Sequence, residues 1–188
     1  MKVMGRGHPS ETECLRLMDE YAMLPNIRAH SRRVHDVALL LGEHLFEAGL
    51  KLELPLLKAG ALLHDIAKTA TINNGGDHAR LGAEWLSRRG HPAVAEIIRE
   101  HVCLSRNPEE PWPLREVEIV NYADKRVLHD RVVTLNQRFD DLRQRYGRTE
   151  AALSRITANQ RRSQCLEQKI FAHITISPDD LLAINEWS

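Results

Sequence analysis

Apolar residues recur every three or four positions along most of the chain, which is the spacing of one face of an α-helix. This pattern predicts helices over residues 10–23, 26–48, 54–68, 77–89, 93–102, 116–146 and 149–171, and a short last helix from residue 177. Residues that commonly cap helices open four of these segments, namely Ser10, Asn26, Asp77 and Thr149. Neither an internal repeat nor a convincing strand pattern accompanies them, so the predicted fold class is all-α.

Two segments depart from the simple amphipathic pattern. Residues 56–63 are almost wholly apolar, which also suits a buried strand, but the length and the alanines of this segment favour a buried helix. Between residues 103 and 114 the prolines surrounding Trp112 forbid a helix. Because this irregular stretch follows His101, it could form a wall or lid of a site. Trp112 would then stack on a base, or else simply pack on the body.

The segment 116–146 carries a further pattern in its later half, where apolar residues alternate at spacings of four and three. These residues are Leu128, Val132, Leu135, Phe139, Leu142 and Tyr146. Such a heptad-like seam is compatible with a homodimer interface or with packing inside the chain.

Composition narrows the classes of protein that fit. The chain has 26 Lys and Arg residues and 26 Asp and Glu residues, so it shows no basic excess of the kind that nucleic-acid binding usually requires. Aromatic residues make up only 5% of the chain, so platforms for base stacking are not expected either. No apolar run reaches the roughly 20 residues that a membrane span needs. The three cysteines are far apart and form no CxxC pair. We therefore expect a cytoplasmic protein with a flexible N-terminus over residues 1–9, rather than a signal peptide.

The ten histidines are the compositional feature that calls for an explanation. Six ionisable residues share their helical stripes with apolar residues three, four or seven positions away, and so face the interior. They are His30, His64, Asp65, His78, His101 and Asp124. Burying an unpaired carboxylate costs several kcal/mol, so cations shared by these side chains explain the set most simply. Imidazoles with carboxylates suit iron, manganese or zinc.

Any one of these residues has a simpler explanation, since a lone inward histidine is more often a hydrogen-bonded core residue than a metal ligand. His44 also has apolar residues one turn behind it, yet it is interpreted as a partly buried helix-end residue. The His-Asp dipeptide also occurs at His35, interpreted as pointing sideways, and at His129, interpreted as lying on a charged helix face. The metal-site prediction therefore depends on the combination of residues.

At these positions the chain resembles the HD superfamily of metal-dependent phosphohydrolases. The matching motifs, in the family's order, are His30-Ser-Arg-Arg-Val34, Leu-Leu-His64-Asp65-Ile-Ala-Lys68, His78-Ala-Arg-Leu-Gly82-Ala, Ile-Ile-Arg-Glu-His101 and Tyr-Ala-Asp124-Lys125. The resemblance implies a bundle of about five core helices. The motifs cover about residues 26–131, and we expect an HD domain over residues 10–147 with a C-terminal helical extension, 148–188, packed on the same domain.

The resemblance also implies the roles of the six residues. Those that match the ligands of a first metal are His30, His64, Asp65 and Asp124. His78 and His101 match the additional pair that supports a second metal, with Asp65 bridging the two. Two divalent transition-metal ions are implied, iron or manganese first, with zinc, nickel or magnesium as alternatives.

In spacing, the chain is similar to small stand-alone bacterial HD hydrolases, including the symmetrical diadenosine tetraphosphatases. The implied reaction is hydrolysis of a phosphoanhydride or phosphoester bond in a nucleotide, such as a dinucleoside polyphosphate, by a metal-activated hydroxide. The chain lacks the Gly-Tyr-Pro of the cyclic-dinucleotide phosphodiesterase branch. The alternatives are a nucleotidase or phosphodiesterase with a single working metal, and a non-catalytic nucleotide-sensing module.

Three basic residues near the motifs are candidates for binding a phosphorylated substrate. Lys68 lies one turn after His64, and Lys125 and Arg126 follow Asp124. As point charges they could hold phosphate, although solvated charges paired with acidic neighbours are an equal alternative. The expected catalytic residues are Asp65 and Lys68.

Overall fold

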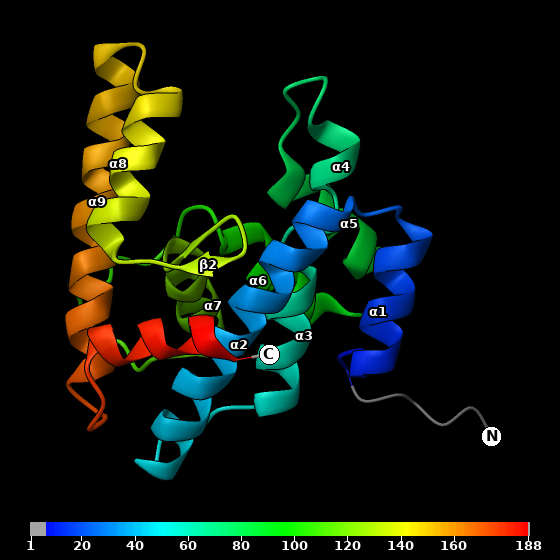
Figure 1. The fold of residues 1–188 in the computed structure, drawn as a ribbon. Helices are drawn as coiled ribbons and strands as arrows, with labels where there is room; N and C mark the ends of the chain where they lie inside the picture. The colour runs from blue at the N-terminus through cyan, green and yellow to red at the C-terminus, as the bar shows by residue number, and fades with distance from the viewer. Residues whose placement is uncertain (1–6, 188) are drawn as a thin grey trace.

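The computed structural model describes residues 7–187. The elements in chain order are α1 (Glu11–Glu20), α2 (Pro25–Glu47), α3 (Leu54–Leu63), α4 (Lys68–Thr71), α5 (His78–Arg88), α6 (Pro92–Glu100), α7 (Glu116–Lys125), β1 (Val127–Leu128), β2 (Arg131–Val132), α8 (Leu135–Tyr146), α9 (Glu150–Phe171) and the 3₁₀ helix η1 (Pro178–Glu186). Figure 1 shows this almost wholly helical architecture, which confirms the all-α prediction. Within residues 7–187, no helix combines the length and apolar character that crossing a membrane requires.

Several helix starts follow directly from local sequence. The side chains of Ser10, Asp77 and Thr149 each accept a hydrogen bond from a backbone N–H in the first turn of α1, α5 and α9, as predicted. Asn26 does not cap α2, because Pro25 already occupies the first helical turn. Of the predicted flexible segment 1–9, residues 1–6 lie outside the described residues and Pro9 is buried.

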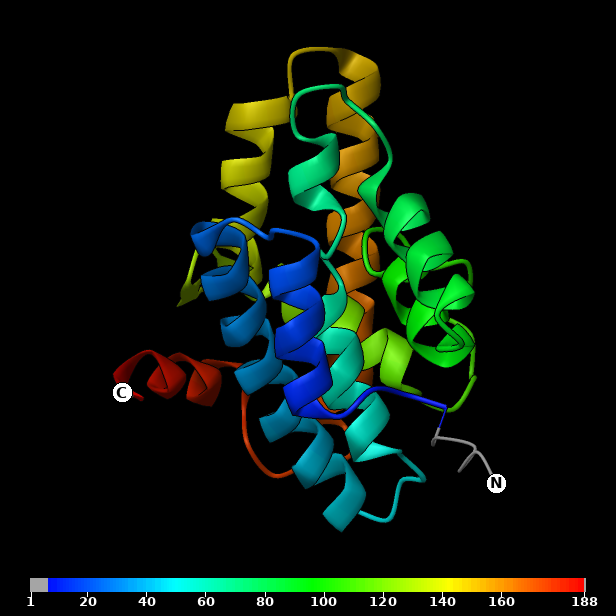
Figure 2. The same cartoon turned by 90° about the vertical axis from the view of Figure 1, so that its right-hand side faces the viewer.

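Five helices, α2, α3, α5, α6 and α7, form the body of the molecule. α3 is buried along most of its length and lies between α2 and α6, while α1 packs against it from outside (Figure 2). The close approach of α3 to α6 occurs at Gly60, where an added Cβ would lie 2.6 Å from Cδ1 of Ile97. Buried side chains of α3 belong to both hydrophobic clusters, Leu57 and Ala61 to one and Ala59, Leu62 and Leu63 to the other, so α3 joins the two halves of the core.

The single helix predicted over residues 116–146 is wrong. α7 ends at Lys125, and the chain forms the antiparallel β1–β2 hairpin, in which Val127 pairs with Val132, before α8 begins at Leu135. His129, at the turn, has a φ of 57°, which no α-helix accepts. The seam is therefore interrupted, and Tyr146 at its end is 62% exposed. The predicted homodimer stays a prediction, and it no longer has a continuous seam as its support.

The helices after β2 form a hairpin and then return to the body. α8, assigned to the HD domain by sequence, pairs with α9 as an antiparallel hairpin that projects from the bundle (Figures 1 and 2). The later half of α9 returns to the body, where Leu166 and Ile170 are buried near α7. η1 then crosses α2 and β2 and buries Leu181 and Ile184. The extension thus shares the main core with the five-helix body.

Candidate metal centre

The six predicted ligand residues lie at or near helix ends. His64 and Asp65 directly follow α3, His78 is the first residue of α5, and His101 directly follows α6. His30 lies in the second turn of α2 and Asp124 in the last turn of α7. These helix ends meet at the end of the bundle from which α4 and the α8–α9 hairpin project (Figure 1). The structure thereby brings all six side chains together.

A first group of ligand atoms forms around Asp124. Its Oδ1 lies 3.0 Å from Nε2 of His30 and 3.7 Å from Nε2 of His64. Oδ2 of Asp65 lies 3.5 Å from the same His64 nitrogen and 4.0 Å from that of His30. His30, His64 and Asp65 each offer one ligand atom within 4.8 Å of the others, so this group could hold a metal ion.

A second group uses the other oxygen of the same aspartate. Oδ1 of Asp65 lies 3.3 Å from Nε2 of His78 and 3.6 Å from Nε2 of His101. These three residues also have ligand atoms within 4.8 Å of one another. Asp65 therefore presents one carboxylate oxygen to each group, which is the arrangement that a bridging ligand requires.

The backbone orients three of the imidazole rings. Nδ1 of His64 donates to the carbonyl of Ala61 at 2.8 Å, and Nδ1 of His101 donates to the carbonyl of Ile98 at 2.6 Å. Nδ1 of His30 donates to the carbonyl of His129 at 2.8 Å. In each ring the Nδ1 hydrogen bond leaves Nε2 with its lone pair facing the cluster, as in metal-ligating histidines.

The polar atoms within the cluster are not satisfied by protein alone. Nε2 of His64 and Oδ1 of Asp65 are buried and have no hydrogen-bond partner. Nε2 of His78 and Nε2 of His101 lie 3.2 Å apart, and two lone pairs at that distance repel unless a cation or proton lies between them. Buried polar atoms are normally paired, so these unpaired atoms with free lone pairs fit bound divalent cations.

Charge in the cluster also suits a cation. Burial lowers the pKa of His64 to about 3, so this ring is neutral. Burial alone would raise the pKa of Asp65, yet its interactions with His64, His101, His78 and Lys68 hold this pKa well below its usual range. Burial would likewise raise the pKa of Asp124, but Lys125 and His30 outweigh this effect and hold the pKa well below its usual range. Neutral imidazoles and ionised carboxylates are the protonation states that bind metals.

Two of the three predicted substrate-binding residues lie beside the cluster. Nζ of Lys68 donates to Oδ2 of Asp65 at 2.7 Å, and the side chain is 41% exposed. Nζ of Lys125 is buried and donates to Oδ2 of Asp124 at 2.7 Å and to the carbonyl of His101 at 2.9 Å. Lys68 can therefore reach both a ligand and solvent, whereas Lys125 orients ligands from inside the fold.

Arg126 does not join the cluster, which contradicts its predicted role in substrate binding. Its guanidinium donates to the carbonyls of Val133 and Pro178 at 2.7 and 2.9 Å, and to the hydroxyl of Tyr122 at 2.7 Å. The residue is 1% exposed. Arg126 lies one turn after Tyr122, whose hydroxyl contacts Glu167 of α9, and both side chains point toward α9. Asp124 points instead toward the other ligand residues.

The irregular segment 103–114 also faces α9. Arg162 donates to the carbonyls of Leu104 and Arg106, and Lys169 donates to the carbonyl of Glu110. The indole of Trp112 lies under the guanidinium of Arg106, 5.4 Å from it. None of these contacts involves the six ligand residues, so among the described residues the segment is tied to α9 rather than to the site.

Sequence reasoning missed the contribution of His129. It was interpreted as part of a charged helix face, but it lies at the β1–β2 turn, and its carbonyl accepts the hydrogen bond of His30. Its ring nitrogen Nε2 in turn lies 3.0 Å from NH2 of Arg145 on α8. The sequence gives little indication of this role, because only the conformation of the turn directs the carbonyl of His129 toward His30.

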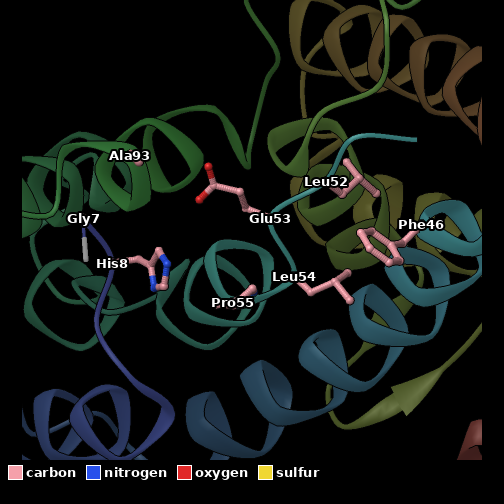
Figure 3. Close-up of a pocket in the computed structure, with 8 residues that line it drawn as sticks. All are labelled: Gly7, His8, Phe46, Leu52, Glu53, Leu54, Pro55 and Ala93. Carbon is pink, nitrogen blue, oxygen red and sulfur yellow. The ribbon is translucent and has the colours of Figure 1, made fainter. Parts of the chain in front are cut away.

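A separate hollow lies far from the cluster, at the opposite end of α3. Phe46, Leu52, Leu54 and Pro55 line it, with Glu53 at its edge (Figure 3). Its lining contains none of the six ligand residues.

Comparison with known proteins agrees with the geometry. The HD domain family matches residues 27–127, which is more than half of the chain. The chain belongs to the HD domain family. HD domains bind divalent metals and the class comprises metal-dependent phosphohydrolases, in keeping with the two His and Asp groups described above.

Among particular relatives, the chain is similar to a tRNA (cytidine(56)-2'-O)-methyltransferase of Picrophilus torridus, with 31% identity over 70% of this chain and 40% of the relative. It is also similar to ribonuclease Y of Aquifex aeolicus, with 36% identity over 53% of this chain and 16% of the relative. The chain thus spans less than half the length of these relatives. A crystal structure of a predicted HD superfamily hydrolase from an uncultured Thermotogales bacterium aligns with 87% of this chain and 92% of that one, at 23% identity and a TM-score of 0.48.

Proposed function

We propose that the chain hydrolyses a phosphoanhydride or phosphoester bond of a nucleotide, using two divalent transition-metal ions, iron or manganese. The observation that carries the proposal is the position of Asp65. Its two carboxylate oxygens face two separate groups of histidine nitrogens, so one buried side chain could bind both ions. Paired cations in a phosphohydrolase neutralise the phosphoryl oxygens and activate the attacking water.

The protein's own residues have distinct tasks in this proposal. His30, His64 and Asp124 would hold one ion, and His78 and His101 the other. Lys68, bonded to Asp65 and partly exposed, would bind a phosphoryl oxygen of the substrate as it enters. Lys125 would keep Asp124 in place from inside the fold.

The substrate proposed first is a dinucleoside polyphosphate, following the motif spacing. A phosphodiester bond in RNA is the second candidate, and the similarity to ribonuclease Y over 53% of this chain favours it. A nucleotidase or phosphodiesterase with a single working metal remains the alternative on the same scaffold, and a nucleotide sensor without catalysis is the alternative outside enzymes.

The test begins with the purified chain, its metal content by elemental analysis and product release from a panel of nucleotides and oligoribonucleotides. Asp65→Ala should lower turnover by more than about 100-fold, beyond the 10–100-fold typical of losing an outer-shell partner, because both ions lose a ligand. Helical content by circular dichroism should stay unchanged. The matched control is Asp36→Ala, which alters another His-Asp dipeptide whose aspartate pairs with Arg33 instead.

The results separate the alternatives. Wild-type protein that stays inert with added iron, manganese and zinc would refute the hydrolase proposal, and binding without turnover would favour the sensor. A His78→Ala variant with full activity would favour a single working metal. Activity retained in Asp65→Ala would refute the bridging role.

A further inference from the structure

We infer that Arg138 and Arg145 of α8, together with Lys68, form a phosphate-binding subsite beside the candidate metal centre. It would hold a phosphate group of the substrate other than the one that is cleaved. This inference rests on the proposed function and names the feature of the substrate that these residues recognise.

The two arginines are held together on one face of α8. Asp141 lies between them, with Oδ1 2.9 Å from Nε of Arg145 and Oδ2 3.6 Å from NH1 of Arg138. Arg145 also contacts the ring of His129, whose carbonyl accepts from the ligand His30. Through these contacts, α8 is fixed relative to the metal centre.

Arg138 has charge that its neighbours do not satisfy. Its side chain is 16% exposed, its Nε is buried without a hydrogen-bond partner, and the 3.6 Å pair with Asp141 is too long for a hydrogen bond. Oδ2 of Asp141 is also unpaired. A mostly buried guanidinium with an unused donor is costly unless an anion binds it, and phosphate matches its planar set of donors.

Lys68 and the two arginines come from different parts of the chain and reach the metal centre through different contacts, Lys68 through Asp65 and Arg145 through the ring of His129. Lys68 bonds to the bridging Asp65, whereas the ion pairs and hydrogen bonds of the two arginines reach none of the six ligands. The arginines therefore lie one step farther from the ions than Lys68, where a second phosphate would lie.

The charge of the whole hairpin agrees with this placement. Residues 135–171 contain eight Lys and Arg against four Asp and Glu, although the full chain has no net charge. A positive element beside the site attracts anionic substrates and raises their local concentration. α8 lies outside residues 27–127, which match the HD family, so the two arginines come from a part of this chain beyond the matched segment.

The experiment compares substrates that differ in the number of phosphates. Arg138→Gln and Arg145→Gln are assayed on p-nitrophenyl phosphate, on diadenosine tetraphosphate and on a short oligoribonucleotide. We expect KM to rise about tenfold for the substrates with several phosphates, with kcat nearly unchanged and no effect on p-nitrophenyl phosphate, since a charge-assisted hydrogen bond contributes on that scale. The control is Arg148→Gln, an exposed arginine in the α8–α9 turn.

A second measurement does not depend on turnover. Calorimetric binding of inorganic tripolyphosphate to the protein without added metal should weaken about tenfold in Arg138→Gln and less in Arg138→Lys, which keeps the charge. If wild type hydrolyses nothing while this binding difference appears, the proposed function fails and the subsite stands. Thermal melting establishes that each variant is folded.

The outcomes also identify the source of the phosphate. A KM effect confined to diadenosine tetraphosphate indicates a polyphosphate chain, and one confined to the oligoribonucleotide indicates a neighbouring phosphodiester. Equal effects of Arg138→Gln and Arg148→Gln, equal effects on all three substrates, or unchanged KM and tripolyphosphate binding would each overturn the inference.

Discussion

His129 adopts a backbone conformation that few residues other than glycine accept, and it does so next to a candidate metal ligand. Its φ of 57° turns its carbonyl toward Nδ1 of His30, 2.8 Å away. A β-branched residue is strongly disfavoured in this conformation, whereas glycine adopts it freely. The carbonyl of His129, rather than its imidazole, therefore orients His30.

This reasoning predicts opposite behaviour for two substitutions. His129→Val should weaken metal binding about 10–100-fold, the usual cost of losing an outer-shell partner, because the strained turn moves the carbonyl away from His30. His129→Gly should keep metal affinity near that of wild type. Both variants lose the ring that contacts Arg145, so a difference in metal affinity between them reports on the carbonyl alone. Competition with a metal-binding indicator measures this affinity. Equal losses in the two variants would contradict the role of the carbonyl.

At the scale of elements, the spacing between α3 and α6 sets the distance between ligands. Asp65 follows α3 and His101 follows α6, and their ligand atoms lie 3.6 Å apart. The two helices approach closely at Gly60, where an added Cβ would meet Ile97 at 2.6 and 2.8 Å. A glycine in a helix usually costs stability, so here it is explained by the close approach.

Gly60→Ala should therefore destabilise the protein by about 1–3 kcal/mol, because overpacking outweighs the better helix propensity of alanine. Urea unfolding measures this difference. Ile97→Val removes Cδ1, the atom nearest to the new methyl group, and should recover part of the loss when combined with Gly60→Ala. Additive effects in the double variant, or a stabilised single variant, would contradict the close contact.

At the scale of the whole molecule, Arg126 joins the helical body to the C-terminal extension. Its guanidinium contacts Tyr122 of α7, Val133 after β2, Pro178 of η1 and, at 3.3 Å, Glu167 of α9. Because it is 1% exposed, few of these interactions could be replaced by water. The extension should consequently unfold together with the body.

Arg126→Met should lower the free energy of unfolding by about 2–4 kcal/mol, since the carbonyls of Val133 and Pro178 lose their donor and the carboxylate of Glu167 loses its cationic partner. Arg161→Met, at an exposed position of α9, is the control and should change stability little. Urea unfolding followed by circular dichroism and by tryptophan fluorescence should give one coincident transition in wild type. Two separate transitions would show that the extension is an independent unit.

Periodicity and capping determined much of this protein from sequence alone. The spacing of apolar residues predicted the helices and which side chain of each helix faces inward, and residues such as Ser10, Asp77 and Thr149 predicted where helices begin. These features depend on neighbours within one or two turns, so local sterics and hydrogen bonds suffice. All six candidate ligands could be named for that reason.

Only the tertiary structure decided how these side chains meet and what surrounds them. His30 and Asp124 are 94 residues apart, yet their ligand atoms lie 3.0 Å from each other. The break after Lys125, the inward burial of Arg126 and the contact of Arg145 with His129 likewise depend on the packing of separate elements. Such contacts arise from the packing of whole helices against one another, which no local pattern encodes.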